Sequence, residues 1–322
     1  MKLIRHLKTS PERFERSVVT IGNFDGVHLG HQRIFHRLIE RARALDATSV
    51  AYTFDPHPLK ILNPEAAPKI LTPLDKKAKL IAQLGVDVLV CERFTEEFAA
   101  QSPEDFVREV LVERLRARHV FVGYDYRFGK GRAGNIDLLR DLGERWGFAV
   151  DVTEAYSVDG EIVGSTLIRR LVSEGRVREA ARFLGRTFFF RGRVVHGKER
   201  GKKMGIPTAN LVTETEVLPS NGVYAVYVDL DGRRYHGAMN VGVNPTFGDA
   251  AGRQLEVFVL NYEGDLYGKS LRVHFVERIR EERKFPNPEA LVAQIRRDVD
   301  QIRDILQRED ARSDTLSYGP GD

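Results

Sequence analysis

A short apolar run followed by a glycine-rich turn is the feature that most constrains this chain. Val18–Ile21 is apolar and β-branched, and residues 22–32 continue as Gly-Asn-Phe-Asp-Gly-Val-His-Leu-Gly-His-Gln. Glycines permit a tight turn and a close approach of the backbone to a ligand. A helix that begins near Gly30 or His31 would point its free N–H groups and the positive end of its dipole at an anion. The stretch therefore predicts a strand, a phosphate-holding loop and a helix.

Two histidines in this loop indicate what chemistry it performs. His28 and His31 are three residues apart, so both are expected to project towards the bound phosphates as donors. Adenylyl or cytidylyl transfer to a phosphorylated acceptor needs positioning and charge stabilisation, because the acceptor phosphate is already nucleophilic and pyrophosphate leaves. The alternative is a zinc site or a surface pair.

The single cysteine, Cys91, ends the apolar run 88–91 and is interpreted as a buried structural thiol.

The length, composition and net charge limit the classes of protein to which this chain can belong. The chain has 322 residues, enough for one large or two medium domains, and 42% of them are hydrophobic, which excludes global disorder. The net charge of +4 suits a phosphate-handling enzyme but is too small to indicate nucleic acid by itself. Residues 1–17 are charged and contain no apolar leader, and no apolar run reaches about 18 residues. The expectation is a cytoplasmic protein that contacts no membrane.

The first half of the chain alternates between strand and helix patterns. Apolar runs predict strands over Val18–Ile21, Ser49–Phe54, Val86–Cys91, His119–Val122 and Ala149–Val152. Amphipathic stretches predict helices over 31–45, 74–84, 103–117 and 136–147, with Ser102 and Pro103 as a helix start, and two short helices over 166–174 and 176–183. This alternation predicts an α/β fold with a doubly wound, Rossmann-like parallel sheet. Ligands of such sheets bind at the carboxyl ends of the strands.

The pattern changes after Gly185. Strands are predicted over Phe188–Val195, Gly222–Leu230, Arg234–Gly242, Gln254–Leu260 and Leu271–Arg280, and Asp231-Gly232 is a hairpin signal between two of them. Closely spaced antiparallel strands predict a small β-barrel. A helix is expected from about Pro288 to Gln307. We therefore expect domains over 1–184 and 185–307 and a disordered tail over 308–322.

The motif Gly22–Gln32 resembles the N-terminal motif of the bacterial bifunctional riboflavin kinase/FAD synthetase family. The resemblance implies that the first domain transfers the AMP part of ATP to FMN. It assigns ATP and phosphate contacts in the first domain to Gly22, Asn23, Phe24, Asp25, Gly26 and Gly30, beside the phosphate-stabilising pair His28 and His31.

Three further segments extend this resemblance. Residues 123–135 resemble the family's second loop, in which Asp125, Tyr126 and Phe128 would contact flavin and Lys130 or Arg132 would meet phosphate; an ordinary basic surface loop is the alternative. Residues 53–58 resemble its third loop, with Phe54, His57 and Pro58 as flavin contacts; a solvated loop histidine is the alternative for His57.

Residues 164–169 resemble a serine-serine-threonine-x-isoleucine-arginine motif, with Ser165, Thr166 and Arg169 as phosphate contacts. Gly164 replaces the usual first serine, so one hydroxyl is lost. For Ser165, a helix cap alone is the alternative.

The second domain carries its own set of candidate phosphate-binding and metal-binding residues. Residues 192–205 are rich in glycine and basic residues and could fold over the phosphates of a nucleotide through Gly192, Gly197, Lys202 and Gly205, although the P-loop pattern is absent. A solvated basic loop or a nucleic-acid patch is the alternative. Residues 206–211 resemble the proline-threonine-alanine-asparagine motif of riboflavin kinases. In extended backbone Thr208 and Asn210 point to one side, where their oxygens could meet a Mg²⁺ held by ATP. A Pro-Thr turn with Asn210 as a cap is the alternative.

Glu256 is the charged residue of the apolar run 254–260. The resemblance makes it the general base for the riboflavin hydroxyl, a role that suits a partly desolvated carboxylate; an outward-facing strand glutamate is the alternative. Residues 240–247 are family-like and are expected to be structural. Arg283 and Phe285 resemble a C-terminal flap over flavin, with a helix-entry loop as the alternative.

The resemblance, which spans about residues 17–307, predicts a two-step transferase. The second domain would phosphorylate riboflavin with ATP and Mg²⁺, giving FMN and ADP, and the first would convert FMN and ATP to FAD and pyrophosphate. No nucleic acid or membrane is expected as a partner, and a transient homo-oligomer is left open. The rivals are an enzyme with one degenerate domain, hinted at by Gly164, and a nucleotide-binding domain fused to an RNA-binding barrel, hinted at by the basic loop.

Overall fold

The computed structural model describes residues 1–197, 207–243 and 253–317, and the chain divides into two compact units, 1–165 and 166–322. Each unit is described by itself. Among the described residues, none of the helices is long and apolar enough to cross a membrane.

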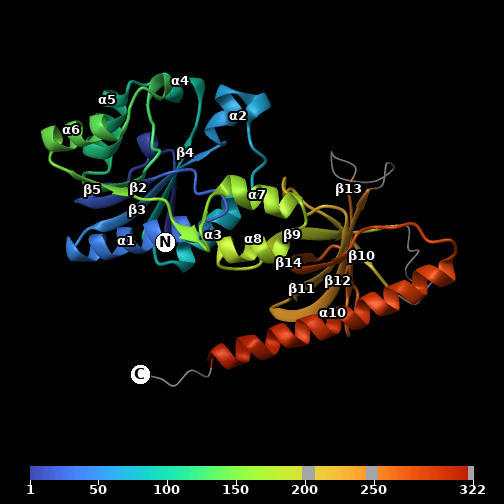
Figure 1. Ribbon diagram of the computed structural model, residues 1–322. Helices are drawn as coiled ribbons and strands as arrows, with labels where there is room; N and C mark the ends of the chain where they lie inside the picture. The colour runs from blue at the N-terminus through green and yellow to red at the C-terminus, as the bar shows by residue number, and fades with distance from the viewer. Residues whose placement is uncertain (198–206, 244–252, 318–322) are drawn as a thin grey trace. The chain divides into compact units, whose positions relative to one another are not determined.

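The first unit is built on a six-stranded parallel sheet, as the alternating pattern predicts (Figure 1). Its strand order is β1-β4-β3-β2-β5-β6, and all neighbouring pairs are parallel. The strands are β1 (Lys2–Arg5), β2 (Ser17–Ile21), β3 (Thr48–Asp55), β4 (Val88–Arg93), β5 (Ala117–Gly123) and β6 (Ala149–Thr153). The sequence analysis does not predict strand β1. Its four residues are Lys, Leu, Ile and Arg, and two consecutive apolar residues are too few to indicate a strand.

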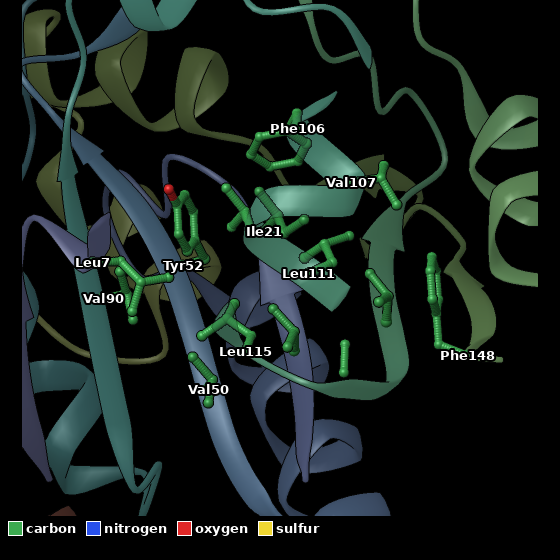
Figure 2. Close-up of a cluster of buried hydrophobic side chains, with 14 of the residues drawn as sticks. Leu7, Ile21, Val50, Tyr52, Val90, Phe106, Val107, Leu111, Leu115 and Phe148 are labelled. Atoms are coloured by element: carbon green, nitrogen blue, oxygen red, sulfur yellow. The ribbon is translucent and has the colours of Figure 1, made fainter. Parts of the chain in front are cut away.

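Helices cover both faces of this sheet. They are α1 (Leu29–Ala44), α2 (Pro58–Leu62), α3 (Leu74–Gln83), α4 (Glu96–Ala99), α5 (Pro103–Phe106) and α6 (Ile136–Trp146), with short 3₁₀ turns at Leu7–Thr9, Pro64–Ala66 and Lys130–Arg132. Alternate residues of each strand face opposite sides, so Val19 and Ile21 join one core while Val18 joins the other. Figure 2 shows the first of these cores, in which Tyr52, Phe106 and Leu111 surround Ile21.

The helix predicted over 103–117 differs from expectation. Ser102 caps it by accepting the backbone N–H of Asp105, as predicted, but after α5 the chain continues as a π-helical segment over Val107–Arg114. This wider winding lines up Phe106 with Leu111, and Val110 with Leu115, at intervals of five residues, and all four side chains are buried in one core.

The chain order of the strands defines a reversal point in the sheet. From β2 the chain proceeds to β3 and β4 on one side and then returns to β5 on the other side of β2. Such a reversal leaves a crevice outside the carboxyl ends of the two adjacent strands. The motif loop after β2 and the loop after β5 both begin at this edge.

The second unit contains a closed antiparallel barrel, which confirms the predicted architecture. Its order is β10-β13-β12-β11-β14-β9, closing between β9 and β10. The strands are β9 (Phe188–Val195), β10 (Ala209–Val212), β11 (Gly222–Leu230), β12 (Arg233–Val243), β13 (Arg253–Val259) and β14 (Ser270–Arg280). Asp231 and Gly232 have positive φ values of 49° and 79°, which the hairpin turn requires.

A helix packs on the outside of the barrel. This helix, α8 (Val177–Leu184), packs on β14 and β9. It follows α7 (Ser165–Ser173) in the chain, which comes after a small hairpin of β7 (Ser157–Val158) and β8 (Glu161–Ile162). Helix α8 thus lies in the second unit, whereas the predicted boundary falls at 184/185 and stays a prediction.

The last helix is longer than the sequence predicts. Helix α10 extends over Pro288–Ser317, so 308–317 is helical where a disordered tail is expected, and that prediction is wrong for these residues. The physical reason lies in the acidic pair Glu309 and Asp310. Arg178 contacts Glu309 at 3.1 Å, and Tyr227 and His236 contact Asp310 at 2.7 and 2.8 Å, so this polar turn is attached to the barrel.

A buried histidine in the barrel makes a pH-dependent contribution to stability. His274 lies between Asp229 and Thr187, at 3.0 Å from the first and 3.1 Å from the second. Burial lowers the pKa of His274 from 6.5 to about 4, although Asp229 opposes the shift. The unfolded chain therefore binds a proton between these pH values that the folded barrel does not. Stability is expected to fall by at most about 1.4 kcal/mol per pH unit as pH drops from about 6.5 towards 4.

The measurement is an NMR titration of the imidazole, assigned by comparison with His274→Gln. We expect the ring to stay neutral at pH 5, and the variant to lose the corresponding part of the pH dependence of unfolding. A ring that titrates near 6.5 would contradict the expected role of burial.

Candidate functional sites

The two motif histidines meet at the N-terminus of α1. His28 is the N-cap residue, and its Nδ1 accepts the backbone N–H of His31 at 3.3 Å. The two imidazole rings stack with centroids 3.5 Å apart and planes at 20°. Because Nδ1 of His28 accepts a hydrogen bond, the proton of the neutral ring resides on Nε2, which is therefore a donor. The structure confirms that His28 and His31 lie together at a helix N-terminus, beside the reversal point of the sheet.

Gly30 is required by this stack. A Cβ at this position would lie 3.3 Å from both Cε1 and Nδ1 of the His28 ring. That distance is shorter than ordinary van der Waals contact, so a larger residue would push the His28 ring away from its position over the helix end.

Gly30→Ala is therefore expected to reduce phosphate chemistry at this loop by about 10-fold without unfolding the protein. Alanine favours helix over glycine by about 1 kcal/mol, so the melting temperature should stay equal or rise. The measurement compares turnover in the first unit with the melting temperature. A variant with unchanged turnover would show that the position of the His28 ring is not critical.

Asp25 organises the motif loop from inside the protein. It is buried, and its two carboxylate oxygens accept the backbone N–H groups of Leu71 and Thr72 at 3.1 and 2.9 Å. The hydroxyl of Thr72 in turn accepts the N–H of Gly26, which has φ of 88°. Asp25 thus joins the motif loop to the segment before α3, and its predicted phosphate contact remains a prediction.

Lys77 is a second anchor, which the sequence analysis missed. This residue on α3 is buried, and its Nζ donates to the carbonyl oxygen of Asn23 at 2.7 Å. Burial lowers its pKa, while the carboxylates of Asp25 and Asp55 act in the opposite direction. The same carbonyl of Asn23 accepts the hydroxyl of Thr53 at 3.3 Å. Lys77 falls on the apolar face of the helix pattern over 74–84. A lysine at such a position is the sequence signal that could have identified Lys77 as a buried anchor.

The side chain of Phe24 lies in the hydrophobic core and not on the surface of the loop. Its ring is 2% exposed and packs against Phe35 with centroids 4.8 Å apart. A Cβ at Gly22 would lie 3.0 Å from this ring, which explains the glycine there. Any nucleotide contact of Phe24 must therefore come from its backbone.

The loop after β3 contacts the motif loop directly. His57 caps α2 by accepting the N–H of Leu59 at 3.2 Å, and its Nε2 lies 3.1 Å from Nδ2 of Asn23. His57 is half-buried and contacts both Leu59 and Asn23, and its predicted flavin contact stays a prediction. Pro58 begins α2 beside it.

An aromatic cluster lies beside these loops at the carboxyl edge of the sheet. Phe54 packs against Tyr52, Phe94 and Phe98 with centroids 5.5 to 5.7 Å apart. The ring of Phe54 is half-buried, whereas that of Tyr52 is fully buried. The cluster provides the apolar surroundings that a flat heteroaromatic ligand needs at this edge.

The loop after β5 adds to the aromatic cluster. Tyr126 stacks on Phe128 with centroids 5.4 Å apart and planes at 17°, and burial raises the pKa of Tyr126. Phe128 is 7% exposed and packs on Phe106, and a Cβ at Gly134 would lie 2.8 Å from its ring. Phe128 thus supports the half-buried Tyr126, which is the better placed of the two for a ligand. Asp125, Lys130 and Arg132 are exposed on the same loop.

Ser165 also touches the motif loop. Its hydroxyl donates to the carbonyl oxygen of Asp25 at 2.8 Å, a contact that a helix cap alone would not make. A Cβ at Gly164 would meet open space, so the departure from the family pattern removes a hydroxyl without a steric reason. Thr166 and Arg169 belong to the second unit, and their predicted phosphate contacts stay predictions.

The barrel places the candidate kinase residues in one row. Glu256 on β13 is directly opposite Asn210 on β10 and Asn240 on β12. Leu255 and Val257 are buried in the barrel, so Glu256 faces outward, as the alternative for this residue supposed. It is nevertheless half-buried, and its Oε1 accepts Nε2 of Gln254 at 2.6 Å. A partly desolvated carboxylate held by a neighbour is suited to act as a base.

The predicted metal-binding residues carry oxygen atoms of the kind that coordinate Mg²⁺. Thr208 directly precedes β10 and Asn210 lies in it; both are half-buried. A Cβ at Gly197 would lie 2.0 Å from Nδ2 of Asn210, so the backbone there closes over the amide. Hydroxyl and amide oxygens are ligands that Mg²⁺ accepts. Lys202 and Gly205 lie outside the described residues, and Gly192 is buried in β9.

Arg283 lies between β14 and α10. It is exposed, contacts Phe285 with its guanidinium 5.0 Å from the ring centroid, and donates to Gln294. Arg280 lies over the same ring at 5.6 Å. Cation–π contacts from Arg280 and Arg283 therefore both involve the ring of Phe285.

Comparisons with known proteins identify the family of each part of the chain. A family model described as FAD synthetase matches residues 10–167, and one described as riboflavin kinase matches residues 184–306. The fold and the sites thus define a two-domain transferase that joins a nucleotidyltransferase to a flavokinase.

Individual relatives support the same assignment along nearly the whole chain. The chain is 40% identical over 299 residues to the "Bifunctional riboflavin kinase/FMN adenylyltransferase" of Pseudomonas fluorescens, covering 93% of this chain and 96% of the relative. It is 39% identical over 302 residues to the protein of that name from Escherichia coli K12, covering 92% and 96%. The chain belongs to the family of bifunctional riboflavin kinases/FMN adenylyltransferases.

A solved structure shares the fold over most of the chain. It is titled "Macrolide-efflux Protein from Streptococcus pneumoniae" and superimposes with a TM-score of 0.83 at 29% identity, covering 94% of this chain and 99% of that one.

Proposed function

We propose that the two units act in succession on one flavin. The barrel phosphorylates riboflavin with ATP to give FMN and ADP, and the parallel-sheet unit transfers AMP from a second ATP to FMN, giving FAD and pyrophosphate. The observation that carries the second step is the stacked pair His28 and His31 at the N-terminus of α1.

The chemistry of adenylyl transfer fits what this loop provides. A phosphate oxygen of FMN attacks the α-phosphorus of ATP, and the bond to pyrophosphate breaks. Charge develops on the phosphate oxygens, where Nε2–H of His28, the ring of His31 and the helix N-terminus stabilise it. Asp25, Thr72 and Lys77 hold the loop in place from behind.

The flavin ring of FMN is expected against the aromatic cluster beside Phe54 and Tyr126. Apolar and aromatic surfaces bind such flat rings, while a few polar groups fix their orientation. His57 and Asp125 supply polar groups on the two neighbouring loops, and Lys130 or Arg132 provides positive charge for phosphates.

In the barrel, Glu256 accepts the proton of the terminal ribityl hydroxyl as its oxygen attacks the γ-phosphorus of ATP. The bond to ADP breaks in line with that attack. Thr208 and Asn210 would hold Mg²⁺, which neutralises charge on the ATP phosphates. Arg283 would close over the flavin.

Product analysis tests both assignments together. The full chain is incubated with riboflavin, ATP and Mg²⁺, and flavins are resolved by chromatography over time. FMN should form first and FAD afterwards, and FAD should also form from supplied FMN. FMN without FAD would overturn the assignment of the sheet unit and support a degenerate domain, and absence of FMN would overturn that of the barrel.

A further inference from the structure

A buried carboxylate on the last helix pairs with an arginine at the end of the barrel's last strand. Asp298 on α10 is 3% exposed; its Oδ1 accepts Nε of Arg280 at 3.1 Å and its Oδ2 accepts Nη2 of Arg280 at 2.7 Å. Two parallel contacts of this kind fix the orientation of both groups as well as their distance. The pair therefore gives α10 a fixed point beside the segment 281–287, which connects β14 to the helix.

Gln294 connects this carboxylate to Arg283. It lies one turn before Asp298 on α10, and its Nε2 donates to Oδ1 of Asp298 at 2.7 Å. Its Oε1 accepts Nη2 of Arg283 and also Nη2 of Arg297, the latter at 2.8 Å. An ionised carboxylate only accepts hydrogen bonds and a guanidinium only donates them, so these partners fix which way the amide of Gln294 faces. Gln294 is half-buried, whereas Arg283 is exposed.

The ring of Phe285 is a further contact of Arg283. The Arg283 guanidinium lies 5.0 Å from the ring centroid, and the Arg280 guanidinium, which Asp298 fixes, lies 5.6 Å from it. A cation–π contact at an exposed site is weak, so it does not by itself hold a long arginine side chain in one place. The directional hydrogen bond to Gln294 supplies what the contact with the ring lacks.

We propose that Gln294 is a positioning residue for the kinase reaction, which holds Arg283 in place before riboflavin binds. The proposal rests on the proposed contact of Arg283 with the flavin. A long, exposed side chain loses rotamer freedom when it contacts a ligand, and this loss weakens binding. Because Gln294 fixes the guanidinium in advance, riboflavin binding carries less of that loss. Gln294 acts through Arg283 and takes no part in the transfer of the phosphate.

Gln294→Met tests this role in the full chain. Methionine has a similar length and helix propensity, but its thioether is at most a weak acceptor and donates nothing. Arg280 still pairs with Asp298 in this variant, so the buried carboxylate keeps its charged partner. We expect KM for riboflavin, measured from initial rates of riboflavin consumption, to rise about 10-fold. At saturating riboflavin, kcat and KM for ATP should change little.

Gln301→Met is the matched control, because it makes the same change two turns later on α10, at an exposed position. We expect it to keep the KM values and the melting temperature of the parent. If Gln294→Met lowered the melting temperature but kept the parent KM for riboflavin, the role of Gln294 would be structural only and the proposal would be wrong. A lower KM for riboflavin would overturn it as well, because the contact would then hold Arg283 away from the flavin.

Arg283→Ala, alone and combined with Gln294→Met, distinguishes failure of this inference from failure of the proposed function. If Arg283→Ala keeps the parent KM for riboflavin, the proposed flavin contact of Arg283 is wrong and the positioning role is wrong with it. If Arg283→Ala raises this KM and Gln294→Met does not, only the positioning role is overturned.

The double variant shows the route by which Gln294 acts. If Gln294 acts through Arg283, the double variant should have the same KM for riboflavin as Arg283→Ala alone. A further rise in KM in the double variant would show that Gln294 affects riboflavin binding by another route, which would contradict the proposal.

Discussion

Replacing Glu256 with glutamine is expected to abolish FMN formation while conversion of supplied FMN to FAD continues at the parent rate. A positioned general base contributes about 10²- to 10⁴-fold to a reaction of this kind. Glutamine has the same shape and can still pair with Gln254, so the barrel should keep its fold. The measurement is the rate of FMN formation from riboflavin and of FAD formation from FMN in the same preparation.

The matched control is Gln254→Leu, which alters the same strand without removing the carboxylate. It should reduce FMN formation far less than Glu256→Gln. Loss of both activities in a folded Glu256→Gln variant would contradict two independent sites. Equal effects of the two substitutions on FMN formation would indicate that the strand, rather than the carboxylate, matters.

The architecture was largely predictable because hydrophobic periodicity encodes it directly. Strand β9 has the predicted bounds, and β2 extends the predicted strand by one residue, because each is a run of apolar or alternating residues that ends at a glycine or polar turn. The hairpin at Asp231-Gly232 was predictable because few residue pairs accept two successive positive φ values. The motif loop could be placed at the carboxyl edge of the sheet because the chain leaves β2 there.

What supports the loop could not be predicted, because the supports come from distant segments. Thr72 and Lys77 lie about 50 residues from the motif, and the pattern over 74–84 indicates a helix without indicating what its buried lysine reaches. Phe24 and Phe128 lie within functional motifs, yet their rings fill cores. A motif shows which residues occur together, but not whether a given side chain faces the ligand or supports one that does.

The barrel shows the same limit. Strand β10 was not predicted as an element, since its four residues are too short for a periodic signal, although its row with Glu256 defines the site. The hydrogen bond from Gln254 depends on rotamers, which sequence does not specify. Similarly, the last turns of α10 look like a polar tail until their contacts with Tyr227 and His236 are seen.

Replacing His28 with asparagine is expected to reduce FAD formation from supplied FMN by about 10²- to 10³-fold, with FMN formation unchanged. Removal of one donor that stabilises developing charge in a transition state has an effect of this size. Asparagine is among the best N-cap residues, so it can still accept the N–H of His31 and keep the start of α1 intact. The substitution thus separates the donor Nε2–H from the helix cap, two functions that the native imidazole combines.

His28→Ala is the comparison that makes this separation visible. It removes both functions and should lose comparable activity and, in addition, about 1 kcal/mol of stability in the first unit, measured by denaturant unfolding. If His28→Asn kept most of its adenylyl transfer while His28→Ala lost it, the histidine would be acting as a cap and His31 would have to provide the stabilisation alone. If both variants lose activity and only the His28→Ala variant loses stability, the imidazole acts directly on the phosphates. The helix that begins at His28 then serves to hold the imidazole in place.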